Sequence, residues 1–312
     1  MSRYQEIDLF QINVYSIKDR PSKVEASAFA KRGDVDTSAF LDCLPDILKA
    51  SDFKAFIAAC RKAREEAKPI IIGLGGHVIK CGLTPLLVEL MEQGAVDCFA
   101  VNGSVMIHDF ELAMYGKTSE DVSKALADGS FGMVFETTYG INSLITQASK
   151  EELGLGEAIG KHLLEKAEHP EDSLLAMAYK HNIPVTVHVG IGTDIIHQTP
   201  CADGKAIGDC SHRDFRILCN RLLGLDEGGV FVDLGSAVII PEVFLKALTV
   251  ARNISGKLKN FTTAVFDMNM QYRAWENVCK RPVETGGKGY YFIGHHEIMI
   301  PLWIKSLLGV NG

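Results

Sequence analysis

The 312-residue sequence lacks the features that mark several large classes of protein. Basic residues are not in excess, because 39 Asp and Glu outnumber 32 Lys and Arg and give a formal net charge of −7. A chain without a basic surface releases few phosphate counterions, so we expect no nucleic-acid partner. Apolar runs are short and interrupted by Gly, Pro or charged residues, and we expect no membrane-spanning segment. The first residues also lack the apolar core of a signal peptide, which predicts a cytosolic protein.

Several catalytic and binding motifs are missing as well. The eight cysteines include no Cys-x-x-Cys pair, and we interpret them as reduced core residues. Neither His-Glu-x-x-His nor Gly-x-Ser-x-Gly occurs, so the usual signatures of zinc peptidases and serine hydrolases are absent. Gly73-Leu-Gly75-Gly76 follows the first clear strand but does not match the Gly-x-Gly-x-x-Gly dinucleotide fingerprint.

Buried strands alternate with helices from residue 69 onward. Apolar, β-branched runs such as 69–74, 184–189 and 229–233 predict buried strands, and stretches with helical spacing follow them. This alternation predicts an α/β fold: one doubly wound, mostly parallel sheet with helices on both faces. We assign this domain to residues 69–312 and interpret residues 1–68 as an N-terminal arm and helices that pack on its body.

Polar residues collect where the predicted strands end. The strand at 184–189 runs into Gly190, Gly192, Thr193, Asp194 and His197, and at least four other strands end in a similar way. The carboxyl ends of parallel strands meet at one edge of an open sheet, where ligands bind. Histidine is the usual proton donor or acceptor near neutral pH, and a neighbouring carboxylate fixes its tautomer or tunes its pKa. The sequence therefore predicts an active site at this edge.

The candidate residues form three groups. The candidates for acid–base catalysis are His108, His197 and His295. The carboxylates expected to orient them or to bind a substrate amine are Asp109, Asp194 and Glu297. Strand ends where the backbone turns sharply or approaches a ligand give the cofactor-binding candidates Gly75, Gly76, Asn102, Gly103, Ser104, Gly235, Ser236 and Asp267. Converging histidines also suit Zn²⁺ or Fe²⁺, with the alternative ligand set His77, His108, His197 and His295.

Local patterns add further expectations. Residues 133–138 read as a short strand, and residues 200–210 as a loop near a strand end that would serve as a lid or substrate loop, with Ser211 capping the next helix. In the N-terminal part, residues 42–67 have helical spacing, and Ser51-Asp52 is expected to cap a second helix. Asp109 and Glu111 are spaced i, i+2 and cannot share one helix face.

The order of the strand ends and the short sequence motifs at them resemble the deoxyhypusine synthase family over about residues 69–308. The motifs are Ala100-Val-Asn-Gly103 with Ile107-His-Asp-Phe-Glu111, Ile183-Pro-Val-Thr-Val with Thr193-Asp194, Leu234-Gly-Ser-Ala-Val238, and Glu297-Ile-Met-Ile-Pro301-Leu. This resemblance implies an NAD-binding α/β fold, a homotetramer, and sites at subunit interfaces.

One position departs from that family. Its nucleophilic lysine follows the glycine-rich strand end, where this chain has Ile239-Ile240-Pro241, and Lys246 lies more than a helical turn further on. Without that amine the imine-forming aminobutyl transfer has no carrier, so we do not predict deoxyhypusine synthesis. The leading hypothesis is a cytosolic enzyme that acts on a small polar, amine-related metabolite, with NAD as the implied cofactor. A metal-dependent hydrolase or lyase and a non-catalytic NAD- or polyamine-binding protein stay open as alternatives.

Overall fold

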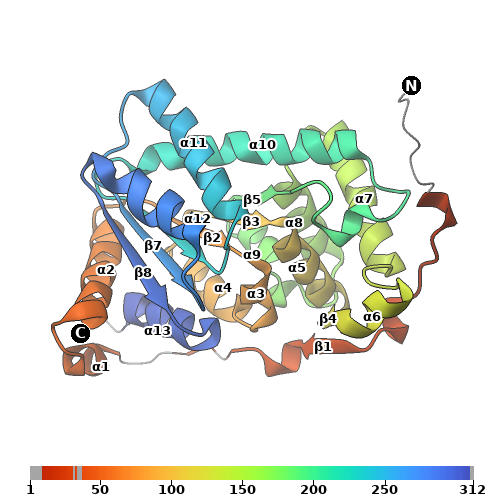
Figure 1. The fold of residues 1–312 in the computed structure, drawn as a ribbon, viewed down its shortest axis with the longest axis horizontal. Coiled ribbons are helices and arrows are strands. Elements are labelled where there is room, and N and C mark those ends of the chain that lie inside the picture. Colours follow the sequence, from red (N-terminus) through yellow and green to blue (C-terminus); the bar gives the residue numbers. More distant parts are fainter. Residues whose placement is uncertain (1–8, 31, 34–36, 310–312) are drawn as a thin grey trace.

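A parallel sheet of six strands forms the centre of the chain (Figure 1). The computed structural model describes residues 9–30, 32–33 and 37–309. The sheet order is β5-β3-β2-β6-β7-β8, and every neighbouring pair is parallel. The strands are β2 (Ile70–Leu74), β3 (Cys98–Asn102), β5 (Val185–His188), β6 (Val230–Leu234), β7 (Thr262–Asp267) and β8 (Lys288–Ile293). Across the described ranges, no helix combines the length and the apolar character needed to cross a membrane.

The sheet is doubly wound, which confirms the predicted fold class. Counted in chain order, its strands lie in the order 3-2-1-4-5-6, so the winding reverses between β2 and β6. Both of these strands are buried along their whole length, which explains the nearly continuous apolar runs in the sequence. The carboxyl ends of all six strands therefore share one edge, where open α/β sheets bind their ligands.

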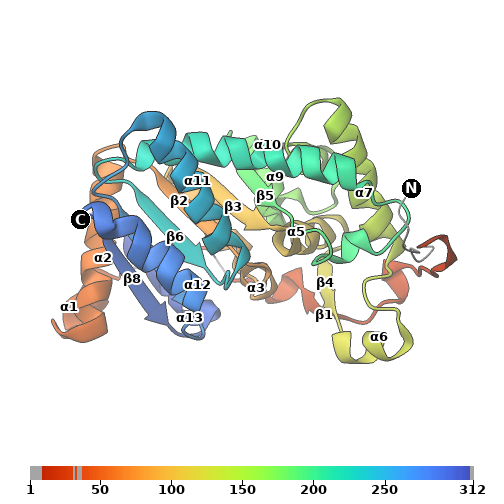
Figure 2. The same cartoon turned by 45° about the horizontal axis from the view of Figure 1, so that its top comes forward.

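Helices cover both faces of this sheet (Figure 2). One face packs against α2 (Leu48–Glu65), α4 (Thr84–Glu92) and α13 (His296–Leu308), with Phe56, Phe266 and Trp303 in its core. The other face lies under α10 (Gly204–Leu222) and α11 (Ile239–Ser255). The remaining helices are α1 (Ser38–Cys43), α3 (Gly76–Lys80), α5 (Gly103–Tyr115), α6 (Val122–Asp128), α7 (Phe135–Lys150), α8 (Leu155–Lys166), α9 (Leu174–Lys180) and α12 (Tyr272–Ala274), which continues into a π-helix (Trp275–Lys280).

A buried carboxylate covers the edge strand β5. Oδ2 of Asp214, on α10, accepts the Val187 N–H at 2.8 Å and the Gly156 N–H at 3.2 Å. Burial raises the pKa of Asp214 to about 7. One side chain thus accepts an N–H group from the open edge of the sheet and another from the amino end of α8.

The described residues that precede β2 pack on the sheet and its helices. Strand β1 (Ser22–Glu25) pairs antiparallel with β4 (Lys117–Glu120), as the lower part of Figure 1 shows. Tyr15 forms an isolated parallel bridge with Val134. These contacts place residue 20 beside α5, close to the carboxyl edge of the sheet.

Two local predictions near the carboxyl edge are wrong. Residues 133–138 are not a strand: apart from the single bridge at Val134, they belong to the start of α7 at Phe135. Residues 200–210 do not form a lid loop, because α10 begins at Gly204. Its N-cap is Asp203, whose carboxylate accepts two backbone N–H groups at 2.9 and 3.1 Å.

Two predicted helix caps are also wrong. Ser211 lies inside α10, and its Oγ donates to the Val187 carbonyl at 2.9 Å and accepts the Val189 N–H at 3.1 Å. It therefore serves the edge strand β5 in place of capping a helix. The second N-terminal helix begins at Leu48, ahead of the expected cap at Ser51-Asp52.

Candidate functional site

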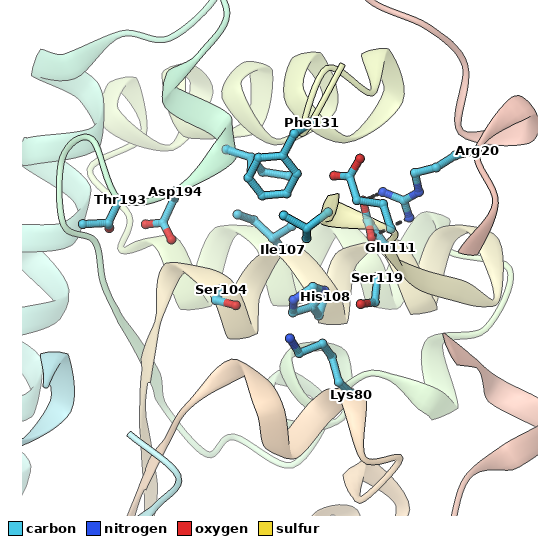
Figure 3. Close-up of a pocket in the computed structure, with 13 residues that line it drawn as sticks. Arg20, Lys80, Ser104, Ile107, His108, Glu111, Ser119, Phe131, Thr193 and Asp194 are labelled. Carbon is cyan, nitrogen blue, oxygen red and sulfur yellow. Dashed lines mark hydrogen bonds and ion pairs between the residues drawn. The ribbon is translucent and has the colours of Figure 1, made fainter. Parts of the chain in front are cut away.

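A cavity of about 230 Å³ opens beside the carboxyl end of β3, between α3, α5, β4 and the loop after β5 (Figure 3). Three of the predicted site residues line it: Ser104, His108 and Asp194. Its further charged lining residues are Arg20, Lys80, Glu111 and Glu120. The cavity therefore lies where the sequence predicted an active site, at the carboxyl edge of the sheet.

Helix α5 supplies one wall of the cavity. It begins at the end of β3, where the Asn102 side chain caps it by accepting the Val105 N–H at 3.1 Å. Ser104, His108 and Glu111 are three or four residues apart, so they share the face that lines the cavity. The Asn102 side chain thus has a structural role as a helix cap, and any contact with a cofactor would come in addition to this role.

A chain of hydrogen bonds determines where His108 carries its proton. Arg20 donates to the two carboxylate oxygens of Glu111 at 2.8 and 2.9 Å. Thr118 donates its hydroxyl proton to Glu111 Oε2 at 2.5 Å, and its Oγ1 lies 2.8 Å from His108 Nδ1. A hydroxyl group has one proton, so the Thr118 oxygen must accept from the Nδ1–H group of His108. The unprotonated ring nitrogen is then Nε2.

Charge and burial reinforce this assignment. Burial alone would raise the pKa of Glu111, but hydrogen bonds from Arg20 and the charge of Arg20 lower it below its usual value. The group is therefore a carboxylate that only accepts hydrogen bonds. Burial lowers the pKa of His108 to about 4, and the nearby charge of Lys80 acts in the same direction. His108 is a neutral imidazole at pH 7.

Asp194 brings a carboxyl group to the cavity from the loop after β5. Its Oδ2 atom is buried and has no hydrogen-bond partner within the described part of the chain. Burial raises the pKa of Asp194 to about 6. The group packs against the start of α5, because a Cβ on Gly103 would lie only 2.2 Å from Oδ2. Gly103 therefore permits a close approach of Asp194 to the positive end of this helix.

Lys80 ends the short helix α3 and points its ammonium group toward His108 (Figure 3). No residue that the structure describes forms an ion pair or a hydrogen bond with this group. Ser119 lines the opposite part of the cavity with a φ of 66°, a left-handed conformation that residues other than glycine rarely adopt. Backbone strain of this kind collects at functional sites.

The other predicted catalytic residues lie outside this cavity. Asp109 is fully buried, and its carboxylate accepts three hydrogen bonds at the start of α9. His197 accepts a backbone N–H on Nδ1 at 3.1 Å within the loop after β5. His295 and Glu297 are exposed at the start of α13, 3.9 Å apart. The structure thus brings together His108 and Asp194 and leaves the remaining four residues elsewhere.

The glycines predicted to bind a cofactor are packed against protein. A Cβ on Gly75 would lie 2.0 Å from the carbonyl oxygen of Gly235, across the point where the winding reverses. A Cβ on Gly76 would lie 2.2 Å from the Ser104 hydroxyl oxygen. Glycine is required at both positions for contacts within the chain. Contacts within the chain thus account for glycine at both positions without a cofactor.

Buried polar groups without a partner lie at the same point of the sheet. Asp233 in β6 is fully buried, and burial, followed by the charge of Asp267, raises its pKa well above the usual value. His296 packs against Gly235, and burial lowers its pKa. Within the described residues, neither the Asp233 oxygens nor the His296 ring nitrogens have a hydrogen-bond partner. The predicted residues Ser236 and Asp267 instead accept backbone N–H groups, at 3.2 and 3.0 Å.

The four histidines of the metal alternative do not converge. The His77 ring lies 5.5 Å from that of His296, between centroids, whereas His108 lines the cavity and His295 is exposed. In the part of the chain that the structure describes, one group of three potential ligands lies within 4.8 Å, namely His169, Glu171 and Asp172. This geometry gives the predicted ligand set no support.

The sequence is similar to known proteins over part of its length. No family model matches the chain. A protein of Methanosarcina mazei named "probable deoxyhypusine synthase 2" is 23% identical over 158 residues. The chain resembles the deoxyhypusine synthases. The matched region covers 42% of this chain and 45% of the relative, so the chain spans less than half of the length of that protein.

Solved structures of several proteins match most of this chain. A "putative deoxyhypusine synthase" from Entamoeba histolytica has a TM-score of 0.48 and 11% identity, over 84% of this chain and 88% of that chain. AgrE, solved with ornithine and NAD⁺, has a TM-score of 0.48 and 16% identity, over 82% of this chain and 32% of that chain. The doubly wound architecture itself follows from the strand order and parallel pairing of the sheet.

The residues of the site that the sequence did not predict include Arg20, Lys80 and Thr118. Arg20 precedes its partner Glu111 by 91 residues and lies in the segment interpreted as an arm, so no local pattern connects them. Lys80 offered a usable signal, because it ends the short helix that follows the first strand end. Lys246 does not take the place of the family's nucleophilic lysine. It pairs with Glu242 on the exposed side of α11.

Proposed function

We propose that the chain is an enzyme in which His108 acts as general base on a small polar metabolite that carries an amine. The hydrogen-bond chain from Arg20 through Glu111 and Thr118 to His108 carries this proposal. It supplies a neutral imidazole with a defined tautomer at the wall of a cavity, which is the state that a general base requires. The resemblance to the deoxyhypusine synthases supports an amine as part of the ligand.

Each group has a separate role in the proposed reaction. His108 Nε2 takes a proton from the ligand, and the imidazolium that forms keeps its Nδ1–H bond to the Thr118 hydroxyl. Glu111 stabilises this cation through Thr118, and Arg20 keeps Glu111 ionised. Asp194 receives the amine of the ligand, because its Oδ2 atom has no other partner in the described chain. A positioned base of this kind contributes a rate factor of about 10² to 10⁴.

NAD is the cofactor that the family resemblance implies, and contacts with Gly235 and Ser104 account for the glycines of the β2 turn without it. No step of the proposed proton transfer requires it. A fluorescence titration with NADH decides the question. Saturable binding would support a nicotinamide cofactor at another surface of the carboxyl edge, and the absence of binding would remove NAD from the proposal.

We also propose that the chain forms a homo-oligomer, a tetramer by family resemblance, in the cytosol. Large apolar side chains are exposed together at the ends of β7 and β8 and just beyond them: Met270, Tyr272, Ile293 and Ile298. Exposed apolar clusters of this kind mark interfaces. Light scattering after size exclusion would measure the mass, and Ile298→Asp is expected to lower it. A monomeric wild-type chain would contradict the proposal.

All eight cysteines are free, which supports a reducing compartment such as the cytosol.

The catalytic proposal is tested with a panel of amine-bearing metabolites, with and without NAD⁺, and detection of products by mass spectrometry. His108→Gln is expected to lower kcat/KM by about 10² to 10⁴, and Thr118→Val by a smaller factor. His212→Gln is the matched control, because His212 is exposed on α10 away from the cavity. Unchanged turnover in His108→Gln would contradict the assignment of the base.

A further inference from the structure

Most charges that line the cavity already have a partner. Arg20 and Glu111 neutralise each other in a bidentate pair. Glu120 accepts a backbone N–H at 3.0 Å and a tyrosine hydroxyl at 3.4 Å. Among the described lining residues, two charged groups remain: the ammonium group of Lys80, and the carboxyl group of Asp194 with its buried, unpaired Oδ2 atom.

We propose that the ligand of the cavity is an amino acid, whose carboxylate binds Lys80 and whose ammonium group binds Asp194. This inference rests on the proposed function and narrows its ligand from any amine to a zwitterion. The two anchors come from different walls, Lys80 from α3 and Asp194 from the loop after β5 (Figure 3). The cavity has a volume of about 230 Å³, which suits one small metabolite.

The two unpaired groups favour a ligand with both signs of charge. A charged group held away from water without a partner is costly, and the raised pKa of Asp194 reflects that cost. A zwitterion satisfies Asp194 and Lys80 together. A diamine satisfies Asp194 alone and brings a second positive charge toward Lys80, which like-charge repulsion opposes.

The same arrangement couples ligand binding to the strength of the base. The positive charge of Lys80 helps to lower the pKa of His108. A carboxylate bound to Lys80 offsets this charge, so Nε2 becomes a stronger base when an amino acid is bound. A second ammonium group in the same place would weaken the base further. Lys80 thereby acts as a binding residue that also favours catalysis on the correct class of ligand.

The test compares each α-amino acid with the amine that remains when its carboxylate is removed. The probes are L-ornithine with putrescine, L-lysine with cadaverine, and L-alanine with ethylamine. Isothermal titration calorimetry of the full chain at about pH 7.5 is expected to show at least one amino acid bound about tenfold or more tightly than its amine. Lys80→Met is expected to abolish this preference, whereas Lys80→Arg retains it. Lys205→Met is the control, because Lys205 is exposed on α10.

Three outcomes would overturn the inference: amines that bind as tightly as their amino acids, a preference that survives in folded Lys80→Met, or no binding of any amino acid at millimolar concentration. Asp194→Asn distinguishes the two ends of the ligand, because it is expected to weaken both members of a pair. Tighter binding of amines would leave the proposed function intact, since that function depends on His108 and an amine. Turnover that is independent of His108 would instead overturn the proposed function.

Discussion

His108 Nδ1 lies 2.8 Å from Thr118 Oγ1, and this contact decides which ring nitrogen carries the proton. The two residues come from α5 and β4, and β4 is held by its pairing with β1. Thr118 gives its own proton to Glu111, which Arg20 keeps ionised. The state of the proposed base therefore depends on the N-terminal segment, far from it in the sequence.

Thr118→Val should destabilise the protein by about 1–3 kcal/mol, because it leaves His108 Nδ1–H without an acceptor and Glu111 with one donor fewer. Thr118→Ser keeps the hydroxyl group and should cost less than about 1 kcal/mol. Urea denaturation of the two variants measures the difference. Equal losses in both would mean that the hydroxyl group does not hold the site together.

Arg20→Met should cost about 3–5 kcal/mol of unfolding free energy, since it leaves Glu111 buried without its counter-charge. Lys23→Met is the matched control in the same segment. Lys23 pairs with Asp121 at 3.2 Å on the surface, and its loss should cost less than about 1 kcal/mol. Similar denaturation curves for the two variants would contradict the importance assigned to the buried pair.

His108 should make the fold less stable in mild acid. Its pKa is about 4 in the folded state, against about 6.5 when unfolded. Between these values the unfolded chain binds the additional proton, so the stability contributed by neutral His108 is lost as the pH falls from about 6.5 to about 4. Relative to His108→Gln, the wild type should lose about 2 kcal/mol between about pH 7.5 and about pH 5. Urea denaturation at both values tests this, and a difference that stays constant with pH would exclude the lowered pKa.

Two Gly→Ala variants should shift stability in opposite directions. Gly75→Ala places a Cβ 2.0 Å from a backbone oxygen of Gly235 and should cost about 1–3 kcal/mol or more, because backbone cannot move aside easily. Gly208 lies in α10 with open space around it, and its replacement by Ala should stabilise the protein by roughly 0.5–1 kcal/mol. Thermal unfolding compares them directly, and a Gly75→Ala variant as stable as the wild type would contradict the packing described at Gly75.

The doubly wound sheet could be predicted because its central strands are buried on both faces. Ile70–Leu74 is a continuous apolar run and Val230–Leu234 is interrupted only by Asp233, and such runs between helical stretches have few other interpretations. Local patterns failed where a residue had a stronger partner elsewhere in the chain. Ser211 could have capped a helix, but it bonds to β5, and Asp203 starts the helix instead.

The candidate site was predictable in part. The rule that parallel strands share a carboxyl edge predicted that His108 and Asp194 lie there, and both line the same cavity. The rule could not tell that His108 faces the cavity and that Asp109 does not, because the direction of a helical side chain depends on which face packs inward. Asp109 is used by the start of α9, 64 residues further along the chain. Arg20 was beyond reach for the same reason, since its partner is decided by the tertiary fold.

The tautomer and charge of His108 are measured most directly by long-range ¹H–¹⁵N correlation spectra, with its ring signals assigned by their loss in His108→Gln. We predict one neutral tautomer, protonated on Nδ1 and unprotonated on Nε2, from about pH 7.5 down to about pH 5. A wild-type ring protonated on Nε2, or one that gains its second proton near pH 6.5, would contradict the assignment of His108 as the general base.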